Sequence, residues 1–164
     1  MKEYSTEAIV LDKEPNGELD WRVFLYTPDL GKIAAKVKSG RRITSKLSPH
    51  LEPLNLVKIR LTHKGGWQVA DALKFGELAH RNLKILQLVK AAVLDNHADY
   101  ELWTCLKGGR GAVHEVLKIL GFDPIHAACQ NCGLKPAYFI FADSSFLCGR
   151  CAPPSLTSGD GVRI

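Results

Sequence analysis

The chain has 164 residues and a formal net charge of +5, from 22 basic and 17 acidic side chains. Its hydrophobic content of 46% and charged content of 24% are ordinary for a globular protein and argue against disorder. The length allows one ordinary domain or two small ones. The sequence contains neither an apolar run of signal-peptide type at its N-terminus nor a span of membrane-helix length, so we expect a cytoplasmic protein.

The first part of the chain alternates apolar and polar side chains in the manner of short β-strands. We expect five strands, at residues 4–13, 21–27, 32–38, 55–63 and 67–75. The long connection between the third and fourth strands, together with their short lengths, predicts a small closed barrel. The OB fold is the most economical such barrel because closure removes exposed strand edges, and an SH3-like barrel fits the pattern almost as well.

Two details of this strand region can be tested against a structure. The first strand places Ala8 and Val10 on one face and Ile9 and Leu11 on the other. The Asn-Gly pair at 16–17 that follows it indicates a tight hairpin.

After residue 76 the apolar side chains recur at helical intervals. We expect helices within 77–97, 99–107 and 111–124, with Asp99 as the N-cap of the second and Gly121 at the end of the third. The class is therefore α+β, with a mostly β N-terminal part. The expected division is an OB-fold domain at 1–76, a helical domain at 77–128, a small cysteine-containing element at 129–151 and a flexible, Pro-, Gly- and Ser-rich tail at 152–164.

Four cysteines form the sharpest motif in the chain. Two CxxC pairs are separated by 15 residues, which is room for a hairpin; the pairs are Cys129 with Cys132 and Cys148 with Cys151. Each CxxC brings two thiolates to one ion, and four thiolates fill a tetrahedral zinc shell without an open position. We therefore predict one structural Zn²⁺, with free thiols, a redox pair and an iron–sulfur cluster as the alternatives.

The positive charge is concentrated in the first 76 residues, which carry 13 basic and 9 acidic side chains. Within it, the 22 residues between Asp29 and Glu52 contain no acid at all. Six basic residues lie in this interval: Lys32, Lys36, Lys38, Arg41, Arg42 and Lys46. We interpret them as a phosphate-binding track for nucleic acid, against the simpler reading of a loop that only aids solubility.

Aromatic side chains near this track serve either as barrel core or as stacking platforms for bases, and the core is the more common fate. The four candidates are Trp21, Phe24, Tyr26 and Trp67. No phosphate-cradling GxxxxGK[ST], GxSxG or zinc-deaminase motif is present in the sequence, so we predict a protein that is not an enzyme.

Two stretches resemble the bacterial DNA repair protein RecO family. The first is "TEAIVLDKEPNGELDWRVFLYTPDLGKIAAKVKSGRRITSKLSPHLEPLNLVKIRL", with its "EAIVL" strand, its "TP…GK" turn and its basic connection. The second is "LKILGFDPIHAACQNCG" followed by "LCGRC", which resembles the zinc-binding segment of the family.

The resemblance implies a recombination mediator with an OB-fold domain, a helical domain and a zinc element. Such a protein binds single- and double-stranded DNA, anneals complementary strands and helps to load RecA, working with RecR and with the single-stranded DNA-binding protein. The positions that match the basic DNA-binding surface of the family are Lys36, Lys38, Arg41 and Arg42, with Lys32 and Lys46 beside them. The cysteine quartet matches the zinc ligands of the family.

The helical region between residue 76 and the first CxxC is shorter than in typical relatives, and relatives continue into further helices after the second CxxC. We therefore expect either a reduced family member or a partial sequence. Two other functions remain open on the residues alone: a zinc-stabilised RNA- or ribosome-associated module, and an adaptor whose basic track binds an acidic peptide.

Overall fold

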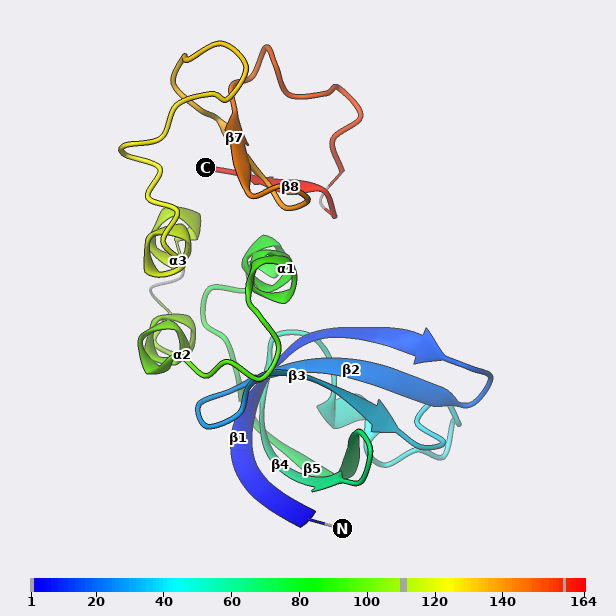
Figure 1. Cartoon of the computed structure of the whole chain (residues 1–164). Coiled ribbons are helices and arrows are strands. Elements are labelled where there is room, and N and C mark those ends of the chain that lie inside the picture. Colours follow the sequence, from blue (N-terminus) through cyan, green and yellow to red (C-terminus); the bar gives the residue numbers. More distant parts are fainter. Residues whose placement is uncertain (1, 110–111, 158) are drawn as a thin grey trace.

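The computed structural model describes residues 2–109, 112–157 and 159–164. A β-barrel, three short helices and a second small sheet follow one another along the chain and along the long direction of the molecule (Figure 1). Among the described residues, no helix has the combination of length and apolarity that crossing a bilayer requires.

The barrel is the predicted OB fold. Its strands are β1 (Lys2–Asn16), β2 (Asp20–Thr27), β3 (Gly31–Val37), β4 (Asn55–His63) and β5 (Trp67–Glu77). They close in the order β1-β2-β3-β5-β4, with β4 returning to pair antiparallel with β1 and β3 pairing parallel with β5. Closure leaves no free sheet edge in the barrel, and the strand order, with β3 parallel to β5, is that of an OB fold and not of an SH3-like barrel.

Strand β1 is buried on both of its faces, as the alternation of its apolar residues predicts. Ala8 and Val10 point into the barrel and belong to its core. Ile9 and Leu11 point outward and belong to a second core, which the helices complete. The predicted hairpin after β1 is also present, because Gly17 adopts a φ of +75° in the turn to β2.

The helices are α1 (Leu83–Ala92), α2 (Tyr100–Lys107) and α3 (Val113–Ile119). Two predicted boundaries are confirmed. The Asp99 side chain caps α2 by accepting a hydrogen bond from Leu102 N at 3.0 Å, and Gly121 has a φ of +86° just after α3.

The helix expected within 77–97 is present, but it is shorter than the periodic stretch at both ends. Glu77 still belongs to β5, and Arg81 takes a left-handed φ of 44° that a helix cannot continue. The helix starts only after Asn82, whose side chain accepts a hydrogen bond from Lys84 N at 3.1 Å. It ends before Val93, which is extended. Leu78 lies before the helix but is buried in the second core, as its place in the apolar pattern predicts.

The second sheet has the order β7-β6-β8 and consists of β6 (Tyr138–Ile140), β7 (Ser145–Leu147) and β8 (Gly161–Arg163). The expectation of a flexible tail is therefore wrong for the last residues. Val162 is buried, and Gly161 lies so close to β6 that an added Cβ would be 2.6 Å from Phe139 O. Tertiary pairing outweighs a composition that by itself favours a loop.

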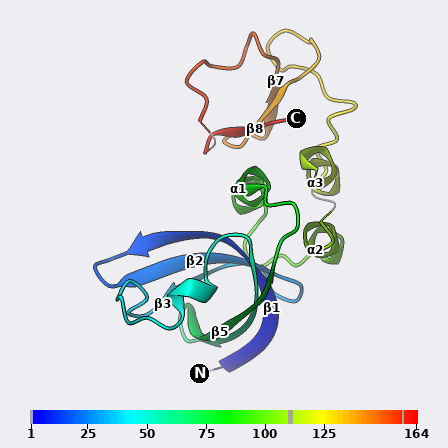
Figure 2. The same ribbon diagram turned by 180° about the vertical axis from the view of Figure 1, so that it is seen from behind.

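The second core joins all three parts of the chain. Its buried side chains include Tyr26 from the barrel, Leu88 from α1, Leu102 from α2, Leu117 from α3 and Phe139 from β6. In Figures 1 and 2, α1 lies between the barrel and the second sheet. The apolar core thus crosses the predicted boundaries at 76 and 128, and the domain division itself stays a prediction.

Polar contacts fix the barrel against the segment between α1 and α2. Asn96 N donates a hydrogen bond to Lys32 O at 2.8 Å. Gly31 has a φ of +67°, and a Cβ there would lie 2.2 Å from His97 O, so only glycine allows this approach. The Tyr26 hydroxyl donates to Asp99 O and accepts from Asp99 N, both at 3.1 Å.

We predict that Tyr26→Phe lowers the free energy of unfolding by about 1–3 kcal/mol, because it leaves both backbone groups of Asp99 without this partner. Urea denaturation of both proteins measures the difference. Burial raises the pKa of Tyr26 to about 12, so its hydroxyl is protonated at neutral pH. The unfolded chain releases this proton first, near pH 10, so the advantage of wild type should shrink as pH rises from about 10 to 12. If the difference in unfolding free energy between wild type and Tyr26→Phe stays constant over this pH range, the hydroxyl of Tyr26 is not buried as described.

Candidate nucleic-acid interface and metal centre

Five of the six predicted basic residues lie on one exposed region of the barrel. Lys36 is on the outer face of β3, and Lys38, Arg41, Arg42 and Lys46 follow in the connection from β3 to β4. This connection, drawn in cyan, lies on the side of the barrel away from α2 and α3 (Figures 1 and 2). We call these five residues the basic loop surface.

The sixth residue, Lys32, lies apart from the basic loop surface. Its Nζ donates a hydrogen bond to Lys90 O at 2.7 Å and lies 3.1 Å from Asp95 Oδ1. Its side chain is only 12% exposed. Lys32 therefore joins the barrel to the segment around α1, although it shares the outer face of β3 with Lys36.

Residues 30–51 contain no acidic side chain, but a carboxylate from the neighbouring strand β2 lies beside them. Asp20 at the start of β2 accepts a hydrogen bond from Ser39 N at 2.7 Å and lies 2.8 Å from Lys36 Nζ. The hydrogen bond with Lys36, and then the one from Ser39, hold the pKa of Asp20 below its usual value. A single carboxylate thus fixes the start of the loop and leaves Lys38, Arg41 and Arg42 exposed.

Trp21 is the aromatic residue against which the basic loop packs. The Arg41 guanidinium carbon lies 5.5 Å from the Trp21 ring centroid, and Lys13 Nζ lies 4.8 Å from it. Arg41 is also held by its backbone N–H, which donates to Leu19 O at 2.9 Å, and by Nη1, which donates to Gly17 O at 2.8 Å. The hairpin after β1 therefore sets the direction of the loop.

A pocket of about 480 Å³ opens beside Trp21. Its lining includes Trp21, Arg41, Arg42, Ile43, Pro49 and Glu52. Glu52 is paired with Lys13, so its negative charge is balanced at the rim. The pocket thus combines an aromatic ring, aliphatic walls and two guanidinium groups.

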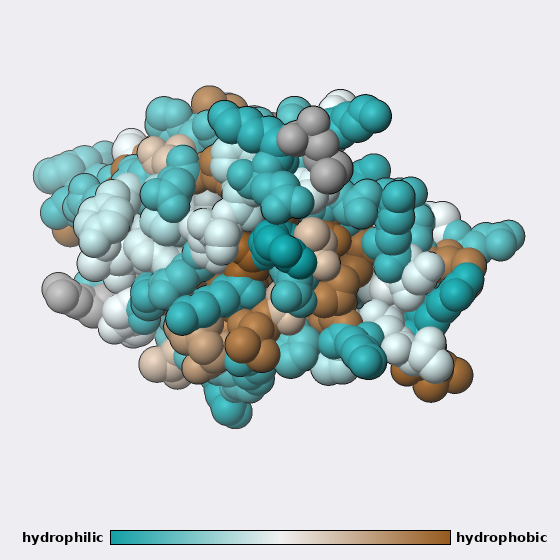
Figure 3. All heavy atoms as spheres, turned by 90° about the horizontal axis from the view of Figure 1, so that it is seen from below, coloured by the Kyte–Doolittle hydropathy of each residue, from teal (hydrophilic) through white to brown (hydrophobic). Residues whose placement is uncertain are grey.

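The other aromatic candidates lie elsewhere. Tyr26 is fully buried in the second core, and Phe24 packs against that core beneath Lys90. Trp67 packs on the barrel core and against Tyr4, with ring centroids 5.0 Å apart. Seen from the barrel end (Figure 3), the surface is mostly hydrophilic, with small groups of hydrophobic side chains between the polar ones.

The four cysteines converge as the double CxxC motif predicts. Their Sγ atoms all lie within 4.8 Å of one another, and those of Cys132 and Cys148 are 3.5 Å apart. Thiolates on the corners of a zinc tetrahedron are about 3.8 Å apart, from a Zn–S bond of about 2.3 Å. The donor set therefore fits a metal ion with four sulfur ligands.

The local chain brings the two pairs together through a hairpin. Strands β6 and β7 pair between Cys132 and Cys148, and Gln130 N donates to Phe146 O at 2.9 Å. Gly133 takes a φ of +74°, which the turn after the first pair requires. Phe139 is buried beneath the hairpin and connects it to the second core.

The thiols already differ in their proton affinity. Burial raises the pKa of Cys129, but hydrogen bonds from the backbone of Cys148, Asn131 and Cys132 outweigh it and bring the pKa to about 6. Hydrogen bonding with Cys132 and Cys148 raises the pKa of Cys151 to about 12. A metal cation would release the protons that the neighbouring thiols still share.

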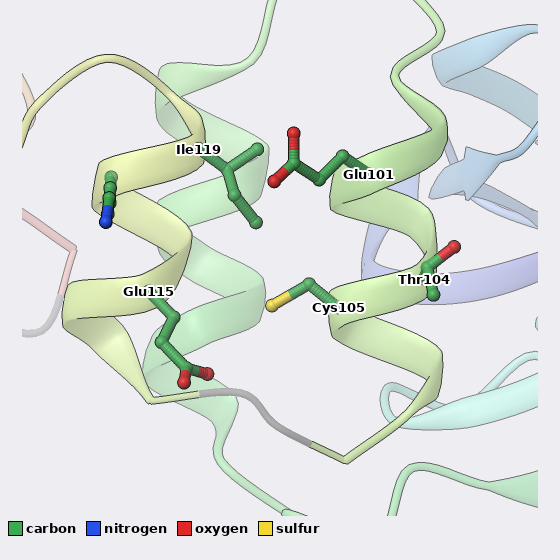
Figure 4. A pocket seen from close by; sticks show the side chains of 6 residues that line it. Glu101, Thr104, Cys105, Glu115 and Ile119 are labelled. Atoms are coloured by element: carbon green, nitrogen blue, oxygen red, sulfur yellow. The ribbon is translucent and has the colours of Figure 1, made fainter.

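A separate hollow of about 470 Å³ lies between α2 and α3 (Figure 4). Its lining residues are Glu101, Thr104, Cys105, Glu115, Lys118 and Ile119. Glu101 and Cys105 project from α2 toward α3 in Figure 4. The carboxylates of Glu101 and Glu115 outnumber the single ammonium group of Lys118, and this charge disfavours a DNA phosphate. The hollow is therefore not part of the candidate nucleic-acid interface.

Sequence reasoning missed the residues that order the basic loop. Asp20 lies outside the basic interval and binds the loop backbone, whereas Gly40 lies within the interval and packs closely on Trp21. The available signal was the strand pairing, since antiparallel β2 and β3 bring Asp20 close to residues 38 and 39. The apolar Ile43 within a polar, basic segment was a second signal.

Comparison with known proteins gives one family. Residues 1–79 match the model for "Recombination protein O N terminal". Two curated proteins, both described as "DNA repair protein RecO", are similar over most of the chain. The one from Dehalococcoides mccartyi is 46% identical, over 81% of this chain and 62% of its own length. The one from Thermodesulfovibrio yellowstonii is 30% identical, over 98% of this chain and 75% of its own length.

The chain thus spans less than two thirds of the Dehalococcoides relative. A third relative, from Syntrophobacter fumaroxidans, is 38% identical over 40% of this chain and 26% of its own length.

We predict that Gly40→Ala destabilises the protein by about 1–3 kcal/mol, because the new Cβ would lie 2.7 Å from Trp21 Cδ1 and 3.0 Å from Val37 Cγ1. Gly66→Ala is the matched control, since nothing lies within 4 Å of a Cβ at that turn. Urea denaturation measures both. Equal stability of the two variants would mean that the loop does not rest on Trp21.

Proposed function

Because this chain belongs to the RecO family of DNA repair proteins, we propose that it is a non-catalytic mediator of recombination that binds single- and double-stranded DNA. The observation that carries this proposal is the basic loop surface. One cation on β3 and four in the connection that follows it project from the OB barrel, on the side away from the negatively charged hollow between α2 and α3. Phosphate binding by such a surface depends on charge and needs no reacting group.

Strand annealing would follow from the same charge. Two complementary strands repel each other through their phosphates, and Lys38, Arg41, Arg42 and Lys46 would neutralise part of that repulsion. The strands could then approach closely enough for their bases to pair. Lys32 contributes to the fold in this proposal, and Lys36 contributes a charge that it shares with Asp20.

The partners are those that the family implies. We propose that the protein acts in the cytoplasm on single-stranded DNA, assists RecA loading, and works with RecR and with the single-stranded DNA-binding protein.

We propose that the four cysteines hold one structural Zn²⁺. Four sulfur donors leave no position for water or substrate, so the ion would stabilise the hairpin and take no part in a reaction. Its effect would reach the second core through Phe139 and Val162.

We predict that the double variant Arg41→Glu/Arg42→Glu weakens binding of single-stranded DNA at least about tenfold at 0.1 M salt. Wild type should show a slope of log K against log salt of about −3 to −4, and the variant a slope shallower by about 1.4, which corresponds to two lost phosphate contacts. Fluorescence anisotropy over a salt series measures both quantities.

The control for this experiment is Lys84→Glu/Lys118→Glu, which makes the same change in net charge on exposed positions of α1 and α3. It should bind nearly as wild type. If both double variants lose affinity equally, binding follows net charge and the basic loop surface is not the site.

We predict that Cys148→Ser lowers bound zinc from one ion per chain to none and lowers the free energy of unfolding by about 4 kcal/mol, because a tetrahedral site loses one ligand. Elemental analysis and urea denaturation measure these changes. Cys105→Ser lies outside the cluster and should keep its zinc. Retention of a full complement of zinc by Cys148→Ser would refute the four-thiolate site.

A further inference from the structure

The most exposed large apolar side chain in the described part of the molecule is at the tip of the basic loop. Ile43 is fully exposed, with a relative accessibility of 105%. Ser45 N donates a hydrogen bond to Arg42 O at 2.9 Å, and Arg42 N donates to Ser39 O at 3.2 Å. These bonds form successive turns that present Ile43 outward between cationic neighbours. The fold gains nothing from this side chain, since it contributes to neither core.

Ile43 also lines the pocket beside Trp21. Ile43 and Pro49 give it aliphatic walls, and Trp21 gives it an aromatic one. The Trp21 Nε1 is a buried donor that finds no hydrogen-bond partner among the described residues. Because Nε1 is buried, the pocket offers the apolar part of the Trp21 side chain, which suits a flat ring better than a polar group.

We propose that this pocket receives one unstacked base of single-stranded DNA, with Ile43 packing on the base and Arg41 and Arg42 on the flanking phosphates. The inference rests on the proposed DNA binding and adds a base-binding subsite to it. The juxtaposition of an exposed aliphatic tip, an aromatic wall and two guanidinium groups matches a nucleotide, which combines a flat apolar base with an adjacent anion.

The subsite gives the protein a means to distinguish strands. In a duplex the bases are paired and stacked, so their faces are not available to Ile43. The phosphates remain available to the arginines in either case. Binding at this pocket therefore favours single strands through the base and tolerates any sequence, because every base has a flat face.

The test compares two labelled strands of equal charge: an oligothymidylate of 20 nucleotides and an abasic strand of the same length. Their affinities for the whole chain are measured by anisotropy over a salt series. Wild type should bind the strand with bases about tenfold more tightly. Ile43→Ser should reduce this ratio to about threefold or less, with the salt slope unchanged because the arginines are intact.

The matched control is Ile125→Ser, an exposed isoleucine in a turn after α3, which should keep the wild-type ratio. Because Ile43 contacts neither core, its substitution should not unfold the chain, and thermal denaturation checks this.

Equal binding of the two strands by wild type would overturn the base subsite and leave the loop as a surface for phosphates, or for the carboxylates of an acidic peptide. An unchanged ratio in Ile43→Ser would overturn it as well. Failure of wild type to bind either strand at low salt would be a different result, because it would refute the proposed DNA binding itself.

Discussion

The double burial of β1 is the constraint on which the rest of the structure depends. A strand with one face in the barrel core and the other beneath the helices cannot shift its register by one residue without exchanging the contents of both cores. The outer contacts of Ile9, Leu11 and Tyr26 fix where the helices sit. Since the helices occupy the outer side of β1 and the nearer part of β2 and β3, the connection between β3 and β4 is left for a ligand. The position of the candidate interface is thus a consequence of core packing.

The basic side chains fall into two groups, one that stabilises the fold and one that stays exposed. Lys32 and Lys90 lie where the barrel meets α1, and each is paired with a carboxylate: Lys32 with Asp95 and Lys90 with Asp12. In the basic loop surface, the cation that is paired in this way is Lys36, whose partner Asp20 also binds the loop backbone. A sequence that looks uniformly basic therefore separates into cations that hold the molecule together and cations that remain available to an anionic partner. The wall of Trp21 beneath Arg41 adds a directional element that charge alone does not provide.

Local and periodic features could be predicted from the sequence, and distant contacts could not. The alternation in β1, the cap at Asp99 and the double CxxC each depend on residues close together in the chain, and the structure confirms the strand, the cap and the convergence of the thiols. The start of α1 within its periodic stretch could not be predicted, because the left-handed Arg81 depends on how β5 ends, which periodicity does not report. Strand β8 was missed because its partner, β6, is some twenty residues earlier, and pairing overrides a loop-forming composition. The pocket beside Trp21 could not be predicted either, because its walls come from two segments that are distant in the sequence, β2 and the basic loop.

The outer face of β1 also has a consequence for the order of events during synthesis. All five barrel strands have been made once residue 77 has emerged, so the barrel can close before the helices exist. Before the helices are made, an apolar surface on the barrel is open to water and to other chains. It consists of Ile9, Leu11, Tyr26 and Leu56. Exposed apolar surface of this kind favours aggregation, and the helices that follow cover it. The helical segment thus protects the barrel that precedes it as well as completing the second core.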